Sequence, residues 1–389
     1  MNPDQQSQDV FPFGIYGGST TAYGINHFNY SALASLGIQF IYVSSANVAK
    51  LEEARILARA NRMQIILNAV PFLAMSEPTR QNIISLLQTY DDVFLGMLCC
   101  DEPHLIKGNN EQYLSQADNI LRTIKNYFPS KINFIDYFPN YATHDQVFND
   151  GKPGELTEEE YELYVQLVAS IPTPIICGDF YTAGDNYHKP YWLNYLRIMR
   201  RASVKFNKPI WQFALCSKHG GYPIVTKADL KFSIYINMMF GAQAIIWYLY
   251  GDYDDGVRHY SHGLFDTDGN TTSLYLDMQD LLTGEAKNYG SLFKNATITD
   301  VELYTVESEE MPDHVKEIVD GEAIVTNFTK GGTPYIAIFG YTDTTVRLYS
   351  NYRRKVNSDL SITILPLRLN NSFDVLSGDL LIFEAVTHV

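Results

Sequence analysis

Short apolar runs and helix-like segments alternate eight times along most of the chain, and this alternation constrains the fold more than any other feature. The apolar runs are nearly continuous, as in Ile38–Val43 and Ala244–Tyr250, which is typical of strands covered on both faces. The runs cover residues 11–16, 38–43, 63–69, 93–100, 132–137, 174–179, 209–215 and 244–250, and the helical segments after them cover residues 26–36, 48–60, 80–89, 110–127, 157–169, 190–206, 226–240 and 273–292. Eight consecutive units of this kind predict a closed (β/α)8 TIM barrel, an α/β fold.

Local signals support the helical segments and disfavour the main alternative fold. Thr157 and Glu160 form a capping box at the start of the fifth segment, Pro190 begins the sixth, and Gly241 follows the seventh. An open doubly wound sheet would carry a GxGxxG turn after its first strand, and the sequence has none there. The closed barrel is therefore the predicted architecture.

The pattern changes after about residue 293 to alternating strands separated by turn residues, as in VELYTV and PYIAIFGY. This spacing predicts an all-β sandwich. Because 389 residues exceed the usual size of one hydrophobic core, more than one domain is expected. We expect residues 1–10 to be disordered or extended, residues 11–292 to form the barrel, and residues 293–389 to form the C-terminal β-sandwich as an accessory domain.

Charge and hydropathy exclude several classes of partner. The net charge is −15 and the only basic cluster is Arg353, Arg354 and Lys355, so no binding to nucleic acid is expected. No apolar stretch has the length of a membrane span, and the polar residues 1–10 lack the apolar region of a signal peptide. A periplasmic or extracellular location is expected if a signal peptide has been removed, and a cytoplasmic one otherwise.

No cofactor is expected either. The four cysteines lie in or beside predicted strands, as core thiols do: Cys99, Cys100, Cys177 and Cys216. The first strand, FPFGIYGG, lacks the His-x-His of the amidohydrolase metal site. A class I aldolase needs a Lys at a strand end, whereas Lys131 and Lys208 lie at strand starts.

Functional residues of a TIM barrel lie at the C-terminal ends of the strands, so the polar residues that close each apolar run are the candidates. They are Asn68 for the third run, Asp101 and Glu102 for the fourth, Asp136 and Asn140 for the fifth, Asp179 and Tyr181 for the sixth, Gln212 for the seventh, and Trp247 and Tyr248 for the eighth. Carboxyl groups surrounded by amides and aromatic rings, without Cys/His ligand spacing, are what the cleavage of a glycosidic bond requires.

Glu102 is the candidate general acid, because the neighbouring charge of Asp101 would raise its proton affinity. Asp179 is the candidate nucleophile or base and Asp136 the fallback, although either could instead hold a loop. The other residues at the strand ends are candidates for binding substrate. Trp247 and Tyr248 could form a floor on which a sugar stacks, but a large aromatic on a barrel strand is as often part of the core.

Segments at these strand ends resemble those of the clan-A-type glycoside hydrolase barrels, most closely a bacterial group whose fourth strand ends in Asp-Glu-Pro. They are GMLCCDEPH (96–104), INFIDYFPNYA (132–142), GDFY (178–181), PIWQF (209–213), GAQAIIWYLY (241–250) and SHGLFDTDGNTT (261–272). The resemblance covers roughly residues 11–292. It implies a hydrolase of O-glycosyl bonds whose partner is a polysaccharide or oligosaccharide. A monomer or small homo-oligomer is expected.

The sequence departs from clan A at two strand ends. The clan has Asn-Glu at the end of strand 4, with the Glu as acid/base, and a second Glu as nucleophile on strand 7. This chain has Asp101 before Glu102, and Gln212 without any Glu on strand 7. Three explanations are open: Asp179 replaces the nucleophile, the substrate supplies its own nucleophile as N-acetyl sugars do, or the barrel binds carbohydrate without cleaving it. The first is the leading hypothesis, and a non-catalytic carbohydrate-binding barrel is the alternative.

Overall fold

The computed structural model describes residues 10–19, 28–45, 47–105, 110–181, 189–254, 256, 259–349, 354–365 and 372–385. Residues 1–9 of the predicted N-terminal segment lie outside these ranges, as do the start of the predicted helix at 26–36 and Arg353 of the basic cluster.

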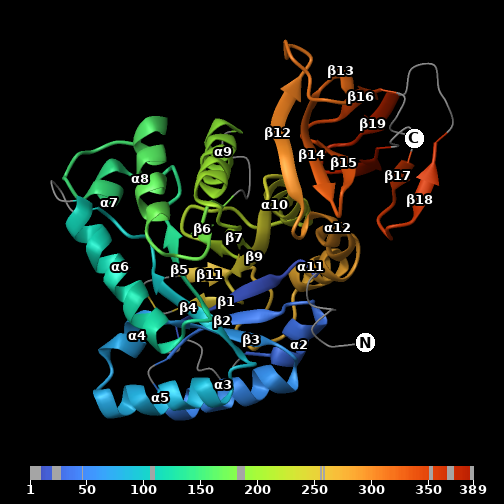
Figure 1. Cartoon of the computed structure of the whole chain (residues 1–389). Helices are drawn as coiled ribbons and strands as arrows, with labels where there is room; N and C mark the ends of the chain where they lie inside the picture. Colours follow the sequence, from blue (N-terminus) through green and yellow to red (C-terminus); the bar gives the residue numbers. More distant parts are fainter. Residues whose placement is uncertain are drawn as a thin grey trace. The chain divides into compact units, whose positions relative to one another are not determined.

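Eight parallel strands form a closed barrel in chain order (Figure 1). They are β1 (Phe13–Ser19), β2 (Phe40–Ser44), β3 (Gln64–Asn68), β4 (Phe94–Cys100), β5 (Ile132–Tyr137), β6 (Ile176–Gly178), β7 (Ile210–Leu215) and β9 (Ala242–Tyr248). The barrel closes where β1 pairs with β9, with Phe13 opposite Ile245. Nearly all of the strand residues are buried, as continuous apolar runs require, and the predicted fold class is confirmed.

The helices that follow the strands begin and end close to the predicted positions. They are α2 (Tyr30–Ser35), α3 (Val48–Ala60), α5 (Glu77–Thr89), α6 (Asn110–Tyr127), α8 (Glu158–Ser170), α9 (Lys189–Phe206), α10 (Lys227–Met239) and α11 (Ser273–Thr283). The predicted capping box is present, because the Thr157 side chain accepts from the Glu160 N–H and the Glu160 side chain accepts from the Thr157 N–H. Gly241 follows α10 with φ of 98°, a conformation that favours glycine.

Three helical features differ from the prediction. A short helix, α4 (Ala69–Ala74), follows β3 directly, because the Asn68 side chain caps the Val70 N–H at a point where the apolar run continues. A second short helix, α7 (His144–Phe148), follows β5. The predicted helix at 273–292 is divided at Gly284 into α11 and α12 (Glu285–Phe293).

The C-terminal part contains a six-stranded and a three-stranded antiparallel sheet. The larger has the order β12 (Thr297–Thr305), β14 (Glu322–Lys330), β15 (Thr333–Gly340), β20 (Leu380–Glu384), β17 (Arg354–Val356) and β18 (Ile362–Ile364); the smaller has the order β13 (Val315–Asp320), β16 (Thr344–Leu348) and β19 (Ser372–Val375). Val325 and Ile336 of the larger sheet belong to one apolar cluster with Val346 and Val375 of the smaller, which is the arrangement of a β-sandwich. The strands β13, β17 and β19 were not predicted.

By the density of its contacts the chain divides into two compact units. One contains residues 12–226 and 244–278, and the other contains residues up to 11, 227–243 and 279–389. The second unit includes α10, whose Phe232 and Tyr235 rings lie 5.8 and 6.2 Å from the Phe339 ring of β15. The division of the chain at residue 293 therefore stays a prediction.

Candidate active site

Four carboxylic residues follow or close three adjacent strands at the C-terminal end of the barrel. Asp101 and Glu102 come directly after β4, Asp136 is the last residue but one of β5, and Asp179 comes directly after β6. The pairs β4–β5 and β5–β6 are parallel neighbours, so the three strand ends meet at one edge. The Glu102 N–H donates to the Asp136 carbonyl oxygen over 3.1 Å, which joins the two strand ends at the site itself.

The backbone at the end of β4 is irregular in two ways. The pairing register with β5 shifts between Leu98 and Cys100, as a β-bulge does, immediately before Asp101. Glu102 has φ of 42°, in the left-handed region that residues with a side chain rarely adopt. Bulges and such conformations redirect side chains and are concentrated at functional sites. This irregular backbone directs both acidic side chains of β4 to the mouth of the barrel.

A cavity of about 350 Å³ lies at this edge. Its lining includes six of the ten residues predicted from the sequence: Asp101, Glu102, Asp136, Asp179, Tyr181 and Tyr248. The structure adds Tyr16, Pro139, Tyr141, Gln146, Phe213, His219 and Tyr222. Tyr16 and Phe213 lie on barrel strands, whereas the other five lie in loops or short elements, where no periodic pattern indicates the direction of a side chain.

The Glu102 and Asp179 side chains form a hydrogen bond with each other. Burial, the charges of Asp136, Glu102 and Asp101, and the hydrogen bond itself raise the pKa of Asp179 well above its ordinary value. Burial and the charge of Asp101 also raise the pKa of Glu102, although the hydrogen bond opposes this rise. Both carboxyl groups therefore have a raised proton affinity, and the contact between them allows the pair to share one proton.

Asp101 and Asp136 complete the acidic cluster in different surroundings. Asp101 keeps an accessible surface because it borders the cavity, yet the protein around it excludes enough solvent to raise its pKa. Asp136 is 3 % exposed, and burial and the charges of Asp101 and Glu102 raise its pKa well above the ordinary value of 3.8. Asp136 is therefore protonated at pH values where an exposed Asp is charged.

The raised pKa of Asp136 predicts a pH dependence of stability. The folded state binds this proton more tightly than the unfolded state, so Asp136 favours folding below about pH 4 and this contribution is lost as the pH rises toward the folded-state pKa. Asp136→Asn should remove this loss, so that the free energy of unfolding falls less steeply as the pH rises, by up to about 1.4 kcal/mol per pH unit. Urea denaturation of both proteins at a series of pH values measures the two slopes, and parallel slopes would contradict the assignment.

Aromatic rings form one wall of the cavity. Tyr181 and Tyr248 stack with ring centroids 5.7 Å apart, and His219 packs against Tyr181, Tyr222 and Tyr248 with centroid distances of 4.7 to 6.1 Å. His219 belongs to a small sheet of β10 (Tyr253–Asp254), β11 (His259–Ser261) and β8 (Lys218–His219). Burial lowers the pKa of His219, which favours its neutral form. Tyr181 is buried, whereas Tyr222 and Tyr248 are half-buried and offer faces on which a sugar ring can stack.

The other four predicted residues are not among those that line the cavity. Asn68 caps α4, and Asn140 donates to the Tyr191 carbonyl oxygen over 2.8 Å. Gln212 is 1 % exposed and accepts a hydrogen bond of 2.7 Å from the Tyr195 hydroxyl. Trp247 is fully buried, opposite Ile15 in the pairing of β9 with β1.

The burial of Trp247 predicts an effect on stability. Trp247→Ala would leave a large cavity in the barrel core and should lower the free energy of unfolding by about 3–5 kcal/mol. Tyr248→Ala is the matched control, because the neighbouring ring is only half-buried and lines the cavity, so it should weaken ligand binding with a smaller loss of stability. Chemical denaturation measures both variants, and equal losses of stability would contradict the distinction.

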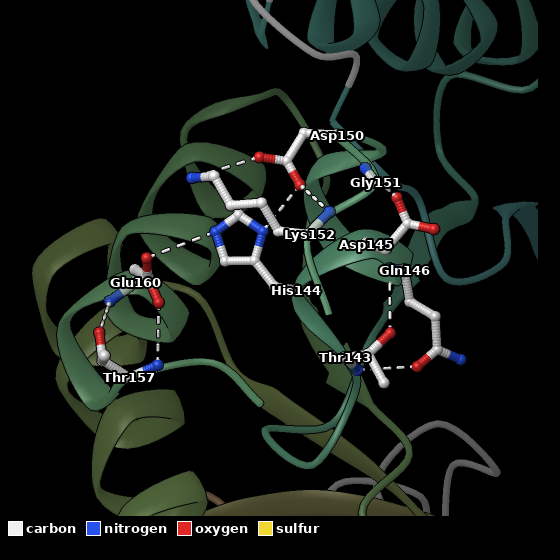
Figure 2. Close-up of polar contacts among 9 residues, drawn as sticks. All are labelled: Thr143, His144, Asp145, Gln146, Asp150, Gly151, Lys152, Thr157 and Glu160. Carbon is white, nitrogen blue, oxygen red and sulfur yellow. Dashed lines mark hydrogen bonds and ion pairs between the residues drawn. The ribbon is translucent and has the colours of Figure 1, made fainter. Parts of the chain in front are cut away.

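A network of polar contacts around His144 holds the cavity wall formed by α7 (Figure 2). The His144 ring lies between two carboxylates, with Nδ1 3.0 Å from Asp150 Oδ1 and Nε2 3.4 Å from Glu160 Oε1 of α8. Thr143 and Gln146 form a capping box at the start of α7, and Gln146 also lines the cavity. The Leu105 N–H donates to the Val147 carbonyl oxygen, which joins the loop after β4 to the same helix.

In the part of the chain that the structure describes, no group of three or more His, Cys, Asp or Glu side chains is arranged to hold a metal ion. Among the same residues, no helix is both long and apolar enough to cross a membrane.

Comparison with known proteins finds similarity in structure alone. No family model and no curated protein matches the sequence. A catalytic mutant of the GH42 beta-galactosidase from G. stearothermophilus matches with a TM-score of 0.61 at 7% identity, over 97% of this chain and 98% of that one. The beta-galactosidase of Marinomonas ef1 matches with a TM-score of 0.48 at 9% identity, over 72% and 60%, and an endo-beta-1,4-glucanase of Xanthomonas axonopodis pv. citri with 0.45 at 10%, over 70% and 98%. The first of these likenesses shows that the fold is shared.

Proposed function

We propose that the chain is a glycoside hydrolase in which Glu102 is the general acid and Asp179 the nucleophile or base. The observation that carries this proposal is the hydrogen bond between the Glu102 and Asp179 side chains, in a cavity with an aromatic wall at the C-terminal end of the barrel. Cleavage of an O-glycosyl bond in a polysaccharide or oligosaccharide requires an acid and a nucleophile or base. Two carboxyl groups with raised proton affinity that share one proton can supply both.

The direct contact of the two carboxyl groups favours a retaining reaction. An inverting enzyme needs about 6.5–9.5 Å between its carboxyl groups to hold a water molecule, whereas a retaining enzyme needs about 5–5.5 Å. Two carboxyl groups that are hydrogen-bonded to each other leave no room for that water molecule. If they move apart slightly as the sugar enters, they reach the separation of a retaining enzyme. Asp179 is then the nucleophile rather than the base.

The shared proton connects the two roles. When the sugar parts the pair, the proton passes to Glu102 and leaves Asp179 as a carboxylate. Glu102 donates the proton to the leaving oxygen as its bond to the anomeric carbon breaks, and Asp179 forms an ester with that carbon. Water then attacks the same anomeric carbon, gives a proton to Glu102 and displaces the Asp179 carboxylate. The charge of Asp101 beside Glu102 favours the protonated state that the first step requires.

The direct test is turnover. The purified protein should release reducing ends from at least one member of a panel of polysaccharides and aryl glycosides. Proton NMR of the first product formed should show the anomeric configuration of the substrate, whereas the opposite configuration would assign Asp179 as a base.

The alternative is a carbohydrate-binding barrel without catalysis, and one observation favours it. Strand β7 carries the buried Gln212 and no Glu, whereas clan A has its nucleophilic Glu on this strand. A barrel of this kind would bind oligosaccharides with dissociation constants between about 1 mM and 1 µM and would turn over none of the panel. Turnover of any glycan excludes this alternative.

A further inference from the structure

We infer that the sugar bound in the cavity carries a free ammonium group, as a 2-amino-2-deoxyhexose does, and that Asp101 is the main partner of this group. The inference rests on the proposed function and specifies its substrate class. It begins from the balance of charge in the cavity. Among the described lining residues there are four carboxylic side chains, no Lys or Arg, and one His that burial keeps neutral.

The carboxyl oxygens of the cavity have unused capacity to accept hydrogen bonds. Oδ1 of Asp136 and Oδ1 of Asp179 are buried, in side chains that are 3 % and 9 % exposed, and neither has a hydrogen-bond partner among the described residues. A buried polar oxygen without a partner is costly and is rare unless a ligand or water satisfies it. Each of these oxygens therefore leaves a hydrogen-bonding position that a ligand can occupy.

Asp101 adds a negative charge to the unpartnered oxygens of the cavity. Its side chain borders the cavity and makes no hydrogen bond to any other described residue. Burial, and after it the negative charge of Asp101, raise the pKa of both Glu102 and Asp136. An ammonium group has three N–H donors, no acceptor and a positive charge. It therefore matches Asp101 and the unused oxygens in hydrogen bonding and in sign, whereas a neutral hydroxyl group supplies one donor and no charge.

The rest of the cavity specifies a ring rather than a simple amine. The half-buried Tyr222 and Tyr248 rings line the cavity, packed against the buried Tyr181, and can contact the C–H groups of a pyranose. The same charge balance opposes anionic sugars, because a uronate, sulfate or phosphate would be brought next to uncompensated carboxylates. N-acetylation of the amine removes the charge and two of the three donors.

Titration calorimetry at low ionic strength and about pH 6, where such amines are protonated, tests the inference on the whole protein. The probes are D-glucosamine, D-glucose and N-acetyl-D-glucosamine, together with the three galacto counterparts. We expect the amino sugar to bind at least about 10-fold more tightly than its neutral and N-acetyl counterparts in one series. Added salt should reduce this preference. Ethanolamine, which carries the ammonium group without the ring, should bind at least about 10-fold more weakly than the amino sugar.

Asp101→Asn should reduce the preference for the amino sugar to within about threefold, while binding of the neutral sugar changes little. Glu159→Gln is the control, because it removes the same charge from an exposed position on α8, and it should keep the full preference. An equal or tighter affinity for the neutral or N-acetyl sugar, an equal affinity for ethanolamine, a preference that persists in Asp101→Asn, or no binding of any amino sugar would each overturn the inference.

The result is separate from that of the turnover test. Selective binding of the amino sugar without hydrolysis of any glycoside would leave the inference standing and remove the hydrolase. Hydrolysis of neutral glycosides with no preference for the amino sugar would support the hydrolase and overturn the inference.

Discussion

Glu102→Gln is expected to lower kcat on the best substrate of the panel by about 10²- to 10⁴-fold, the usual contribution of a positioned general acid. Gln has nearly the same shape as Glu and can still form a hydrogen bond to Asp179, but it cannot donate a proton to a leaving oxygen. KM should stay within a few fold, because the aromatic wall and the other three carboxyl groups are unchanged. Steady-state kinetics of both proteins at one pH measures the effect.

The choice of leaving group separates the loss of an acid from a general loss of structure. An aryl glycoside with an acidic phenol needs little protonation of its leaving oxygen, so the defect of Glu102→Gln should be several-fold smaller on this substrate than on an oligosaccharide. The exposed variant Glu159→Gln should match the unaltered protein on both. A defect of equal size on both substrates, or no defect at all, would remove Glu102 from the role of acid.

Asp179→Ala is expected to cause a still larger loss, of roughly 10⁴-fold or more in kcat, because a retaining reaction has no first step without its nucleophile. The truncation also leaves space beside the anomeric carbon that a small anion can enter. Sodium azide should therefore restore part of the activity on an aryl glycoside and yield a glycosyl azide of inverted configuration. Chromatography and NMR of the products identify this compound.

The same anion distinguishes the roles of the two carboxyl groups. In Glu102→Ala, the nucleophile Asp179 remains and azide attacks the ester intermediate, so the glycosyl azide should have the retained configuration. A glycosyl azide of retained configuration from Asp179→Ala, or of inverted configuration from Glu102→Ala, would exchange the roles assigned to the two residues. Unchanged turnover in Asp179→Ala would show that the substrate or Asp136 supplies the second group.

The acidic cluster costs free energy, because carboxylate charges held close together repel one another. Four carboxyl groups at three adjacent strand ends cannot all be charged in surroundings that exclude water, so protons are retained on Asp136 and on the Glu102–Asp179 pair. A ligand with positive charge, or a transition state that develops it, relieves this repulsion. The proposed reaction and the inferred amino sugar thus depend on the same property of the cavity.

The sequence by itself determined the class of fold and the end of the barrel at which acidic residues gather. Continuous apolar runs, helical periods and caps such as Thr157 with Glu160 depend on neighbouring residues, so they can be interpreted without coordinates. The position of Asp101, Glu102, Asp136 and Asp179 at strand ends follows from the same local pattern, and all four line one cavity.

Only the tertiary structure decided which way side chains point and which distant residues meet. Trp247 and Tyr248 are adjacent in sequence, yet the first is in the core and the second borders the cavity, because successive residues of a strand face opposite sides and closure of the barrel fixes which side is which. Tyr141, Gln146, His219 and Tyr222 reach the cavity from loops and short elements without a periodic pattern. The hydrogen bond between Glu102 and Asp179 and the raised pKa values depend on burial and on charges brought together from separate strands, and such distances are not encoded in any local stretch of sequence.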